Sequence, residues 1–306
     1  MKCSITSHRI LTAVVLFISI SSCKKDISGI ETKSAEEFST STIQPAATGF
    51  GVCDYDLVES TLTSAGWTKR FEDNFTGDLS QWNIWTGGAY NYELQHYQSP
   101  NLIINNSILS IEAKREHVTG VTLPTDPTLK SFDFTSGRIE SKTNFSSSPS
   151  TPKVRIIARL KLPTGYGMWP AFWSYGDPWP THGEIDIMEA RGNEPYKYST
   201  AYWFGRRSGV NSASGTEGSV TSDVSLTDCW HVYEVIWQKN SLTYSLDGKL
   251  AVTKTGGWIS DFYKKTERIT LNLAIGGLFF GNPPPSADLI QTGIMQVDWV
   301  KVFTSN

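Results

Sequence analysis

Short runs in which apolar and polar residues alternate recur along this chain, and they constrain its fold more than any other feature. The runs lie at residues 102–113, 154–162, 230–237 and 268–274, with turn-forming residues between them. Side chains of a β-strand point alternately to the two faces of a sheet, so a period of two predicts strands with one buried face. No long segment sustains helical spacing. We therefore expect an all-β protein, as a sandwich, a jelly roll or a barrel.

Two dipeptides between such runs, Asn105-Asn106 and Asp247-Gly248, are typical of tight hairpin turns. Residues of these types tolerate the positive backbone angles that the turns need. Hairpins join antiparallel strands, so the expected sheets are antiparallel. A sandwich of about 250 residues would use most of the chain as one domain.

The charge of the chain excludes one class of partner. A net charge of −3 and a sequence pI near 6.0 provide no basic surface for a phosphate backbone, so we expect no nucleic-acid partner. Aromatic residues are abundant, with 11 Trp, 12 Tyr and 14 Phe. Flat apolar rings with a polar edge fit the faces of sugar rings, although each ring can also simply pack between two sheets.

The N-terminus is typical of an export signal. Lys2 and Arg9 precede an apolar run over residues 10–20, which is too short to span a bilayer and suits the core of a signal peptide. Residues 20–23, Ile-Ser-Ser-Cys, resemble the lipobox of bacterial lipoproteins, in which the chain is cut before the Cys and that Cys is lipidated. Cys23 is then the expected lipidation site, with plain secretion as the alternative.

These features divide the chain into three parts. We expect a lipoprotein signal peptide at residues 1–22, a flexible polar tether at residues 23–50, and a catalytic domain at residues 51–306. Only Cys53 and Cys229 of the four cysteines belong to this domain, where a disulfide and two buried thiols are both compatible with the sequence. We expect an exported monomer, either anchored to the cell envelope through its lipid alone or secreted.

The most informative segment is residues 182–189, His-Gly-Glu-Ile-Asp-Ile-Met-Glu. Acids alternate with isoleucines, so Glu184 and Asp186 share one face of a strand. Glu189 is five residues after Glu184, and this odd step would turn its side chain to the opposite, apolar face. A one-residue bulge near residues 187–188 would return it, at less cost than burying a lone carboxylate. We name Glu184, Asp186 and Glu189 the carboxylate row.

Three neighbouring carboxylates repel one another, which raises the pKa of at least one of them. A retaining glycosidase uses such a set, with one ionised carboxylate as nucleophile and a protonated one as general acid that later acts as base. An acidic solvated strand face and a divalent-ion site are the alternatives. Upstream aromatic residues favour the glycosidase, because Trp169 and Trp173 fall on one face of an adjacent strand and Trp179 follows them.

The carboxylate row is similar to the E-x-D-x-x-E signature of family 16 glycoside hydrolases, in the laminarinase-like branch. Further landmarks of that family occur in its order over residues 67–304. The resemblance implies a jelly-roll β-sandwich of two curved antiparallel sheets with a concave substrate cleft, and a retaining, endo-acting glycoside hydrolase. The landmarks are Phe71–Phe75, Asn91–Tyr97, Ser136–Ile139, Lys161–Pro163, Trp169–Trp173, Asn272–Gly277 and Val297–Val300.

By position in that signature, the resemblance assigns Glu184 as nucleophile, Asp186 as assisting acid and Glu189 as general acid/base. Two residues separate Asp186 from Glu189, as in the bulged branch that includes β-1,3-glucanases and marine galactanases; lichenases have one. The implied substrate is a polysaccharide, either a laminarin-like β-1,3-glucan or a mixed-linkage glucan.

The resemblance also marks residues that would bind this substrate. Two tryptophans match sugar-stacking positions, and three polar residues match positions in the cleft, where a structural hydrogen bond is the alternative role. A third tryptophan is a further candidate on residues 200–205, where the family often has a His and this chain has none. The sugar-stacking tryptophans are Trp169 and Trp173, the polar cleft residues are Asn91, Glu93 and Arg138, and the further candidate is Trp203.

Two other departures from the family pattern concern His182 and calcium. His182 stands where many relatives have a Cys, and we expect it to support the strand, with a position facing the cleft as the alternative. Many relatives bind structural calcium through an acid of the first strand and the Asp of the last. Here Asp298 is present, but Asn74 replaces the acid of the first strand. Asp298 is therefore a candidate ligand for a structural calcium ion. We expect the reaction itself to require no cofactor.

Two rival functions remain compatible with the sequence. The first is a galactan hydrolase of agarase or carrageenase type, because Arg206-Arg207 could face a sulfated sugar. The second is a carbohydrate-binding protein that has lost the chemistry. Retention of the whole carboxylate row argues against the second, since binding alone does not need all three acids.

Overall fold

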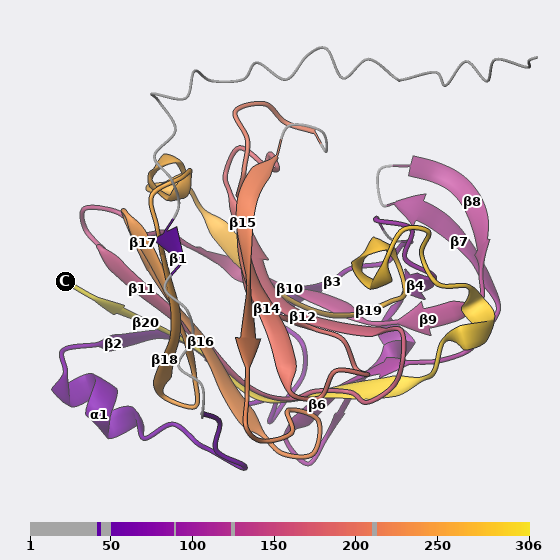
Figure 1. Ribbon diagram of the computed structural model, residues 1–306, viewed down its shortest axis with the longest axis horizontal. Helices are drawn as coiled ribbons and strands as arrows, with labels where there is room; N and C mark the ends of the chain where they lie inside the picture. Colours follow the sequence, from indigo (N-terminus) through magenta and orange to yellow (C-terminus); the bar gives the residue numbers. More distant parts are fainter. Residues whose placement is uncertain (1–41, 44–49, 89, 124–125, 210–212) are drawn as a thin grey trace, which may run out of the picture. The chain divides into compact units, whose positions relative to one another are not determined.

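The structure of the protein is a computed structural model, which describes residues 42–43, 50–88, 90–123, 126–209 and 213–306 (Figure 1). An antiparallel sheet of nine strands and another of seven contain most of the strand residues in the described part of the chain. The all-β fold expected from the sequence is therefore confirmed. The expected signal peptide, Cys23 and nearly all of the tether lie outside the described residues.

The larger sheet has the order β1-β18-β17-β16-β11-β20-β6-β5, and β2 pairs with β20 beside this path. The last strand of the chain, β20, lies inside the sheet and pairs with β11, β6 and β2. Its strands are β1 (Thr42–Ile43), β2 (Thr68–Asp73), β5 (Leu102–Asn105), β6 (Ile108–Ala113), β11 (Lys153–Lys161), β16 (His231–Gln238), β17 (Ser241–Leu246), β18 (Lys249–Thr255) and β20 (Gly293–Ser305).

The smaller sheet has the order β15-β14-β13-β12-β19-β10-β3 and carries the carboxylate row on its third strand, β13. All of its strand pairs are antiparallel. Its strands are β3 (Trp82–Ile84), β10 (Arg138–Phe145), β12 (Met168–Tyr175), β13 (Glu184–Ala190), β14 (Lys197–Phe204), β15 (Ser214–Thr221) and β19 (Glu267–Ile275).

Smaller elements complete the described part of the chain. One two-stranded sheet is parallel and a second is an antiparallel hairpin. No helix among the described residues is long and apolar enough to cross a membrane. These elements are β4 (Gln95–Tyr97) with β9 (Phe134–Ser136), β7 (Val118–Leu123) with β8 (Asp126–Phe132), the helix α1 (Glu59–Ser64), and the 3₁₀ turns η1 (Ser99–Asn101), η3 (Ile259–Phe262), η4 (Leu278–Phe280) and η5 (Ala287–Leu289).

One hydrophobic core lies between the two sheets. Alternation along the strands directs Ile185 of β13 and Tyr202 of β14 into it from the smaller sheet, and Tyr233 of β16 and Tyr244 of β17 from the larger one. Each of these side chains is at most 1% exposed. Burial of apolar area at this scale is the main driving force for the sandwich. The opposite face of β13 is thereby left for polar chemistry.

The predicted hairpins are present, with one shift. Asp247 and Gly248 have φ angles of 50° and 74° and connect β17 to β18, as predicted. The hairpin between β5 and β6 turns instead at Asn106 and Ser107, whose φ angles are 49° and 59°. Asn105 pairs with Ile108 as the last residue of β5, so the predicted turn was one residue too early.

Two short elements differ from the sequence-based expectation. The helix α1 was missed because its six residues give too few turns for helical spacing to show. Thr42 and Ile43 of the expected tether pair with Thr255 and Lys254 at the edge of β18. The unpaired backbone of an edge strand can accept a further strand in this way, and the tether as a whole stays a prediction.

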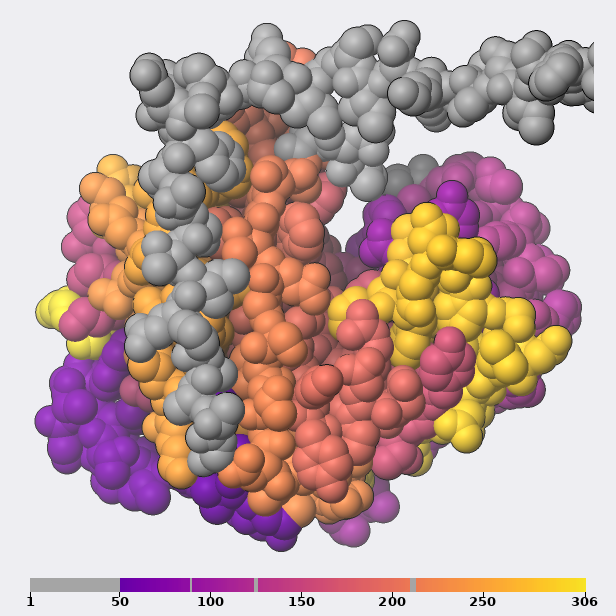
Figure 2. Space-filling model, viewed as in Figure 1, coloured from indigo at the N-terminus to yellow at the C-terminus, as the bar shows by residue number. Residues whose placement is uncertain are grey.

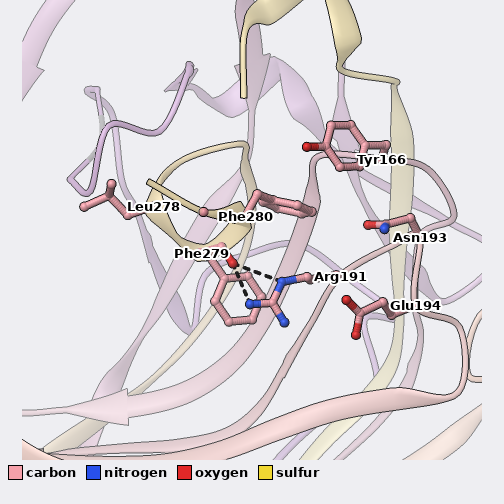
Figure 3. A pocket seen from close by; sticks show the side chains of 8 residues that line it. Tyr166, Arg191, Asn193, Glu194, Leu278, Phe279 and Phe280 are labelled. Atoms are coloured by element: carbon pink, nitrogen blue, oxygen red, sulfur yellow. Dashed lines mark hydrogen bonds between the residues drawn. The ribbon is translucent and has the colours of Figure 1, made fainter. Parts of the chain in front are cut away.

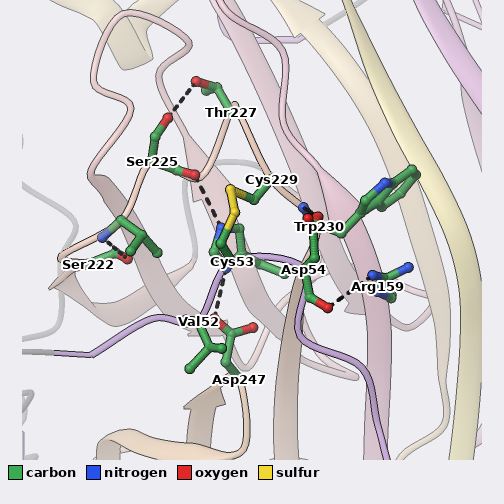
Figure 4. The surroundings of a disulfide bond; sticks show 12 residues. Val52, Cys53, Asp54, Arg159, Ser222, Ser225, Thr227, Cys229, Trp230 and Asp247 are labelled. Carbon is green, nitrogen blue, oxygen red and sulfur yellow. Dashed lines mark hydrogen bonds and ion pairs between the residues drawn. A yellow bond between two sulfur atoms is a disulfide. The ribbon is translucent and has the colours of Figure 1, made fainter.

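A disulfide between Cys53 and Cys229 resolves the alternative that the sequence left open (Figure 4). Its Cα atoms are 5.2 Å apart, within the normal range for such a bond. Beside it, the Val52 N–H donates to Asp247 Oδ2 at 2.8 Å. The start of the folded body is thus fixed to the larger sheet next to β16.

Candidate active site

A β-bulge in β13 aligns the carboxylate row, as the sequence predicted. In the pairing with β14, Asp186 is opposite Ala201 and Glu189 is opposite Ser199, so three steps on β13 match two on β14. The pairing with β12 shows the same extra residue, because Phe172 and Trp173 are opposite Met188 and Asp186. One inserted residue returns Glu189 to the face of the other two acids. The cost of burying it in the core is avoided.

Each acid of the carboxylate row accepts a hydrogen bond from a different tryptophan. Trp179 Nε1 donates to Glu184 Oε2 at 2.6 Å, and Trp203 Nε1 donates to Asp186 Oδ2 at 3.0 Å. Trp169 Nε1 donates to Glu189 Oε1 at 2.9 Å. An indole N–H is a donor only, so each bond orients one carboxylate oxygen and leaves the other for a substrate or a proton. Asp186 is 3% exposed, whereas the two glutamates are half-buried.

Burial and mutual repulsion raise the pKa of all three carboxyl groups. For Glu184, burial first and the charge of Glu189 second raise the pKa to about 8. Burial and the charge of Glu184 raise the pKa of Asp186 well above its usual range, and burial with the charge of Asp186 does so for Glu189. The indole hydrogen bonds only partly oppose these increases. The row therefore keeps protons at neutral pH, as acid catalysis requires.

A continuous row of contacts crosses the sheet from β14 to β10. Trp203 bonds to Asp186, and Trp173 lies opposite Asp186 in the register with β12. Trp173 Nε1 donates to Asn272 Oδ1 of β19 at 2.7 Å, and its ring lies 5.0 Å from the guanidinium carbon of Arg138 on β10. We name these five residues the cross-strand row. Figure 2 shows a hollow between the segment around β15 and that of residues 278–290.

Polar residues at the end of the cross-strand row are tied together by hydrogen bonds. Asn272 Nδ2 donates to the hydroxyl of Tyr97 at 3.1 Å, and Gln95 Nε2 donates to Glu93 Oε2 at 2.7 Å. Burial raises the pKa of Glu93 to about 7, although the hydrogen bond from Gln95 opposes this. Asn91 is exposed with a φ angle of 56°, and its carbonyl oxygen accepts from the N–H of Leu278.

Arg138 is buried and held by several partners. Its Nε and Nη2 atoms donate to Glu140 Oε1 at 3.0 and 2.7 Å, and Nη2 also donates to the hydroxyl of Tyr175 at 3.1 Å. Its guanidinium carbon lies 4.3 Å from the centre of the Trp85 ring. The structural role that the sequence left as an alternative is therefore present, and the flat guanidinium also forms part of the cross-strand row.

Two side chains of the larger sheet hold the strands of the site from behind. The Tyr244 hydroxyl donates to the carbonyl oxygen of Ala201, the residue opposite Asp186. Lys254 Nζ donates to the carbonyl oxygens of Thr200 and Thr216. Both side chains are fully buried. Burial lowers the pKa of Lys254 to about 8, while Asp186 opposes this.

The remaining predicted positions lie away from these contacts. Asp298 Oδ2 is 2.6 Å from Arg159 Nη1, in an ion pair. Within the described ranges, no group of three or more His, Cys, Asp or Glu residues could hold a metal ion. His182 is half-buried, and its Nδ1 atom is buried without a hydrogen-bond partner in the described part of the chain. This burial favours the supporting role expected for His182.

The sequence alone did not single out several residues that the structure places at the site. Trp179 was noted as an aromatic neighbour, but its bond to Glu184 depends on a loop whose path the sequence does not give. Asn272 and Tyr97 belong to landmark segments, yet alternation alone could not show that they meet. Tyr244 and Lys254 come from the opposite sheet, so no local pattern indicated their role.

Fold and site together define a jelly-roll sandwich whose smaller sheet carries an acidic row bordered by tryptophans. The family profile described as "Glycosyl hydrolases family 16" matches residues 90–301. The chain is 31% identical over 275 residues to a glucan endo-1,3-beta-glucosidase of Cryptopygus antarcticus, covering 82% of this chain and 97% of that protein. This protein belongs to glycosyl hydrolases family 16.

Two further proteins are similar over the same region. Glucan endo-1,3-beta-glucosidase A1 of Niallia circulans is 33% identical over 269 residues, which cover 78% of this chain but only 38% of that longer protein. The solved structure of an endo-beta-1,3-glucanase from Pyrococcus furiosus superimposes with a TM-score of 0.64 at 31% identity, covering 78% of this chain and 95% of that one. The family and the jelly-roll fold are thus confirmed.

Proposed function

We propose that the protein is an endo-acting hydrolase of β-1,3-glucan that retains the anomeric configuration. The alignment of the carboxylate row by the bulge carries this proposal, because it provides an acid and a nucleophile on one face of a cleft. The names of the relatives support the choice of a β-1,3-linked glucan over other glycans.

In the proposed first step, Asp186 and Glu189 hold the protons of the row and Glu184 is ionised. The carboxylate of Glu184 attacks the anomeric carbon while Glu189 donates its proton to the glycosidic oxygen. The leaving chain departs with that proton, and a glycosyl ester on Glu184 remains. In the second step, Glu189 removes a proton from water, which attacks the same carbon and releases Glu184. The raised pKa of Glu189 keeps its carboxyl group protonated for the first step.

Asp186 lies between the two glutamates and interacts with both charges. When Glu184 loses its charge in the ester, the repulsion on Asp186 falls, and the proton that the row shares can redistribute. The hydrogen bond from Trp203 keeps the Asp186 carboxylate in place during this change. We propose that Asp186 orients the nucleophile and holds a proton in this way.

We propose that Trp169, Trp173 and Trp203 border the sugar-binding surface, with Asn91, Glu93 and Arg138 as polar residues around it. The half-buried indole rings of the three tryptophans support this role, since each has some exposed area beside the carboxylate row. Asn91 is exposed at the rim, whereas Arg138 is buried and acts mainly by fixing its neighbours.

Product analysis on laminarin, lichenan, xyloglucan, agarose and carrageenan tests the proposed substrate. We expect cleavage of laminarin to oligosaccharides from early times, as an endo-acting enzyme produces, and weaker cleavage of lichenan. Cleavage of agarose or carrageenan alone would instead identify a galactan hydrolase. Binding to glucan without any product would identify a carbohydrate-binding protein.

The proposed steps use carboxylates and water alone, so we propose that the reaction requires no cofactor. Calcium at Asp298 stays a prediction. Its carboxylate is already paired with Arg159, whereas Ca²⁺ prefers a set of several oxygen ligands. Thermal unfolding with calcium and with EDTA tests this, and an unchanged melting temperature would exclude a structural ion there.

We also propose that the protein is exported and anchored through lipid on Cys23, and that it acts as a monomer. The Cys53–Cys229 disulfide supports export, because such bonds persist outside the reducing cytoplasm. Mass spectrometry of the membrane fraction should find lipid on Cys23. A soluble protein cut at another residue would contradict the anchor, and sedimentation of the purified protein tests the monomer.

A further inference from the structure

A cavity of about 500 Å³ opens at one end of the smaller sheet, and its volume lies in the range of small-molecule sites. Tyr166 precedes β12, Arg191 and Glu194 follow β13, and Phe280 ends η4, which follows β19 (Figure 3). In the antiparallel sheet these chain ends lie together, because β12 starts where β13 and β19 finish. Glu189 is the member of the carboxylate row closest in sequence to this end.

Phe279 connects the cavity to the carboxylate row. Its ring stacks on that of Trp169 with centroids 4.4 Å apart and 14° between the planes, and Trp169 in turn donates to Glu189. The guanidinium carbon of Arg191 lies 3.9 Å from the centre of the same ring, and its Nε donates to the Phe279 carbonyl oxygen at 3.0 Å. Phe279 is therefore a fixed wall between the site and the cavity.

The cavity offers the side chains that a neutral sugar needs. The rings of Tyr166 and Phe280 are 5.4 Å apart at 72°, which provides apolar surface in two directions. Glu194 is half-buried, and its carboxylate has no hydrogen-bond or ion-pair partner within the described residues. It can accept bonds from sugar hydroxyls, with the amide of Asn193 nearby (Figure 3). The same carboxylate would repel a sulfate or a uronate.

The position of the cavity decides which sugar of a glycan could reach it. The cross-strand row runs from β14 to β10, across the strands. Its two half-buried tryptophans, Trp203 and Trp173, provide the surface along which a main chain would lie. The cavity instead lies beyond the ends of the strands, past Glu189 and to the side of that row. A sugar bound there would leave the line of the main chain.

We propose that this cavity is a side subsite that binds a neutral hexose branch of the glycan. The inference rests on the proposed function and deepens it, because it makes a branched β-1,3-glucan the preferred substrate. Aromatic contact with Phe280 and hydrogen bonds to Glu194 would hold the branch, while the main chain occupies the cross-strand row.

The test compares a linear β-1,3-linked glucose hexasaccharide with the same chain carrying one β-1,6-linked glucose. In the full-length protein, Phe280→Ala and Glu194→Ala should each lower kcat/KM for the branched chain by about tenfold, as expected for the loss of one aromatic or hydrogen-bonding contact. Both should leave the linear chain within about twofold. Leu289→Ala, an exposed side chain of η5 outside the cavity lining, is the matched control and should change neither.

Equal losses on both chains, or none on either, would overturn the side subsite. Cleavage of the linear chain by the wild-type protein tests the proposed function separately. If neither chain is cleaved, titration calorimetry with the same two oligosaccharides still decides the matter. Tighter binding of the branched chain that is lost in Phe280→Ala supports the subsite, and equal or undetectable binding of both chains refutes it.

Discussion

At the scale of single residues, each acid of the carboxylate row has its own tryptophan donor, from a loop, from β12 or from β14. The three carboxylates are thus oriented independently although they share protons. Removing one acid should disturb the chemistry of the row more than its geometry, because the other two indole bonds remain. This independence makes glutamine a suitable substitute, since its amide oxygen can still accept the indole bond.

Glu184→Gln and Glu189→Gln should each lower kcat on laminarin by at least about a thousandfold, since each removes a group that acts in both chemical steps. Both variants should still fold and bind laminari-oligosaccharides. Initial rates, circular dichroism and calorimetry measure the three properties. Undiminished turnover in either variant would contradict the proposed roles.

Stability should depend on pH through Glu184. Its pKa is about 8 in the folded protein against an ordinary value of 4.5. Below pH 4.5 the carboxyl group is protonated in both states, whereas between 4.5 and about 8 only the unfolded chain releases its proton, so stability falls as the pH rises. Glu184→Gln removes this effect. In thermal unfolding, the melting temperature of the variant should therefore rise relative to that of the wild type from pH 4.5 to pH 8. A difference in melting temperature that stays constant with pH would contradict the raised pKa.

Trp173 tests whether a ring of the cross-strand row binds sugar. Trp173→Ala should weaken oligosaccharide binding by at least about tenfold, because aromatic contact area is lost from a half-buried position. Trp173→Phe keeps a ring but loses the bond to Asn272, so it should bind better than the alanine variant. Titration and melting curves separate the two roles. A collapse of the melting temperature in Trp173→Ala would show that the ring acts mainly as core.

At the scale of elements, the two sheets meet behind the bulge, where Tyr244 bonds to the carbonyl oxygen of Ala201. Tyr244→Phe leaves that buried carbonyl without this partner and should lower the free energy of unfolding by about 1–3 kcal/mol. Tyr233→Phe is the matched control. Its hydroxyl is equally buried but has no partner within the described residues, so its removal should cost nothing. Denaturant unfolding measures both variants, and equal losses would contradict the argument.

Strands and the bulge were predictable because they follow from local rules. Alternation located β11, β16 and β19 to within one or two residues of their observed ends. Glu189 is five residues after Glu184, and this odd number required one extra residue to place both side chains on the same face. The pairing of β13 with β12 and with β14 shows that extra residue. The family resemblance added the jelly roll and the residues of the cleft.

Long-range pairings could not be predicted from the sequence. Thr42-Ile43 pair with β18 across some 210 positions, and no local pattern marks two residues as a strand. Lys254 reads as one more polar residue of an alternating strand, yet it is fully buried beneath the smaller sheet. Such positions depend on which strands become neighbours, and that is decided by the packing of the whole sandwich.

At the scale of the whole molecule, the disulfide joins residues 176 positions apart. A closed loop of that length restricts the unfolded chain, and chain-entropy estimates give a stabilisation of about 5 kcal/mol, with about 2–5 kcal/mol commonly lost on removal. In denaturant unfolding, the double variant Cys53→Ser, Cys229→Ser should show a free energy of unfolding about 2–5 kcal/mol below that of the wild type. Treatment of the wild type with a reducing agent should have the same effect as the variant, and a change below 1 kcal/mol would show that the loop is already constrained.

The disulfide also gives a mechanical load a covalent path into the larger sheet. Tension applied through the residues before Cys53 would pass across the sulfur bridge to Cys229, next to β16, which lies between β17 and β11 inside the larger sheet. The strand β1 lies before Cys53 and pairs with β18, so it would be loaded first. At Cys53 the bridge would share the remaining load with the backbone that leads to α1 and β2. If the protein is held at its N-terminus while its polymer substrate pulls on the site, part of that force would pass through β16, an interior strand of the larger sheet.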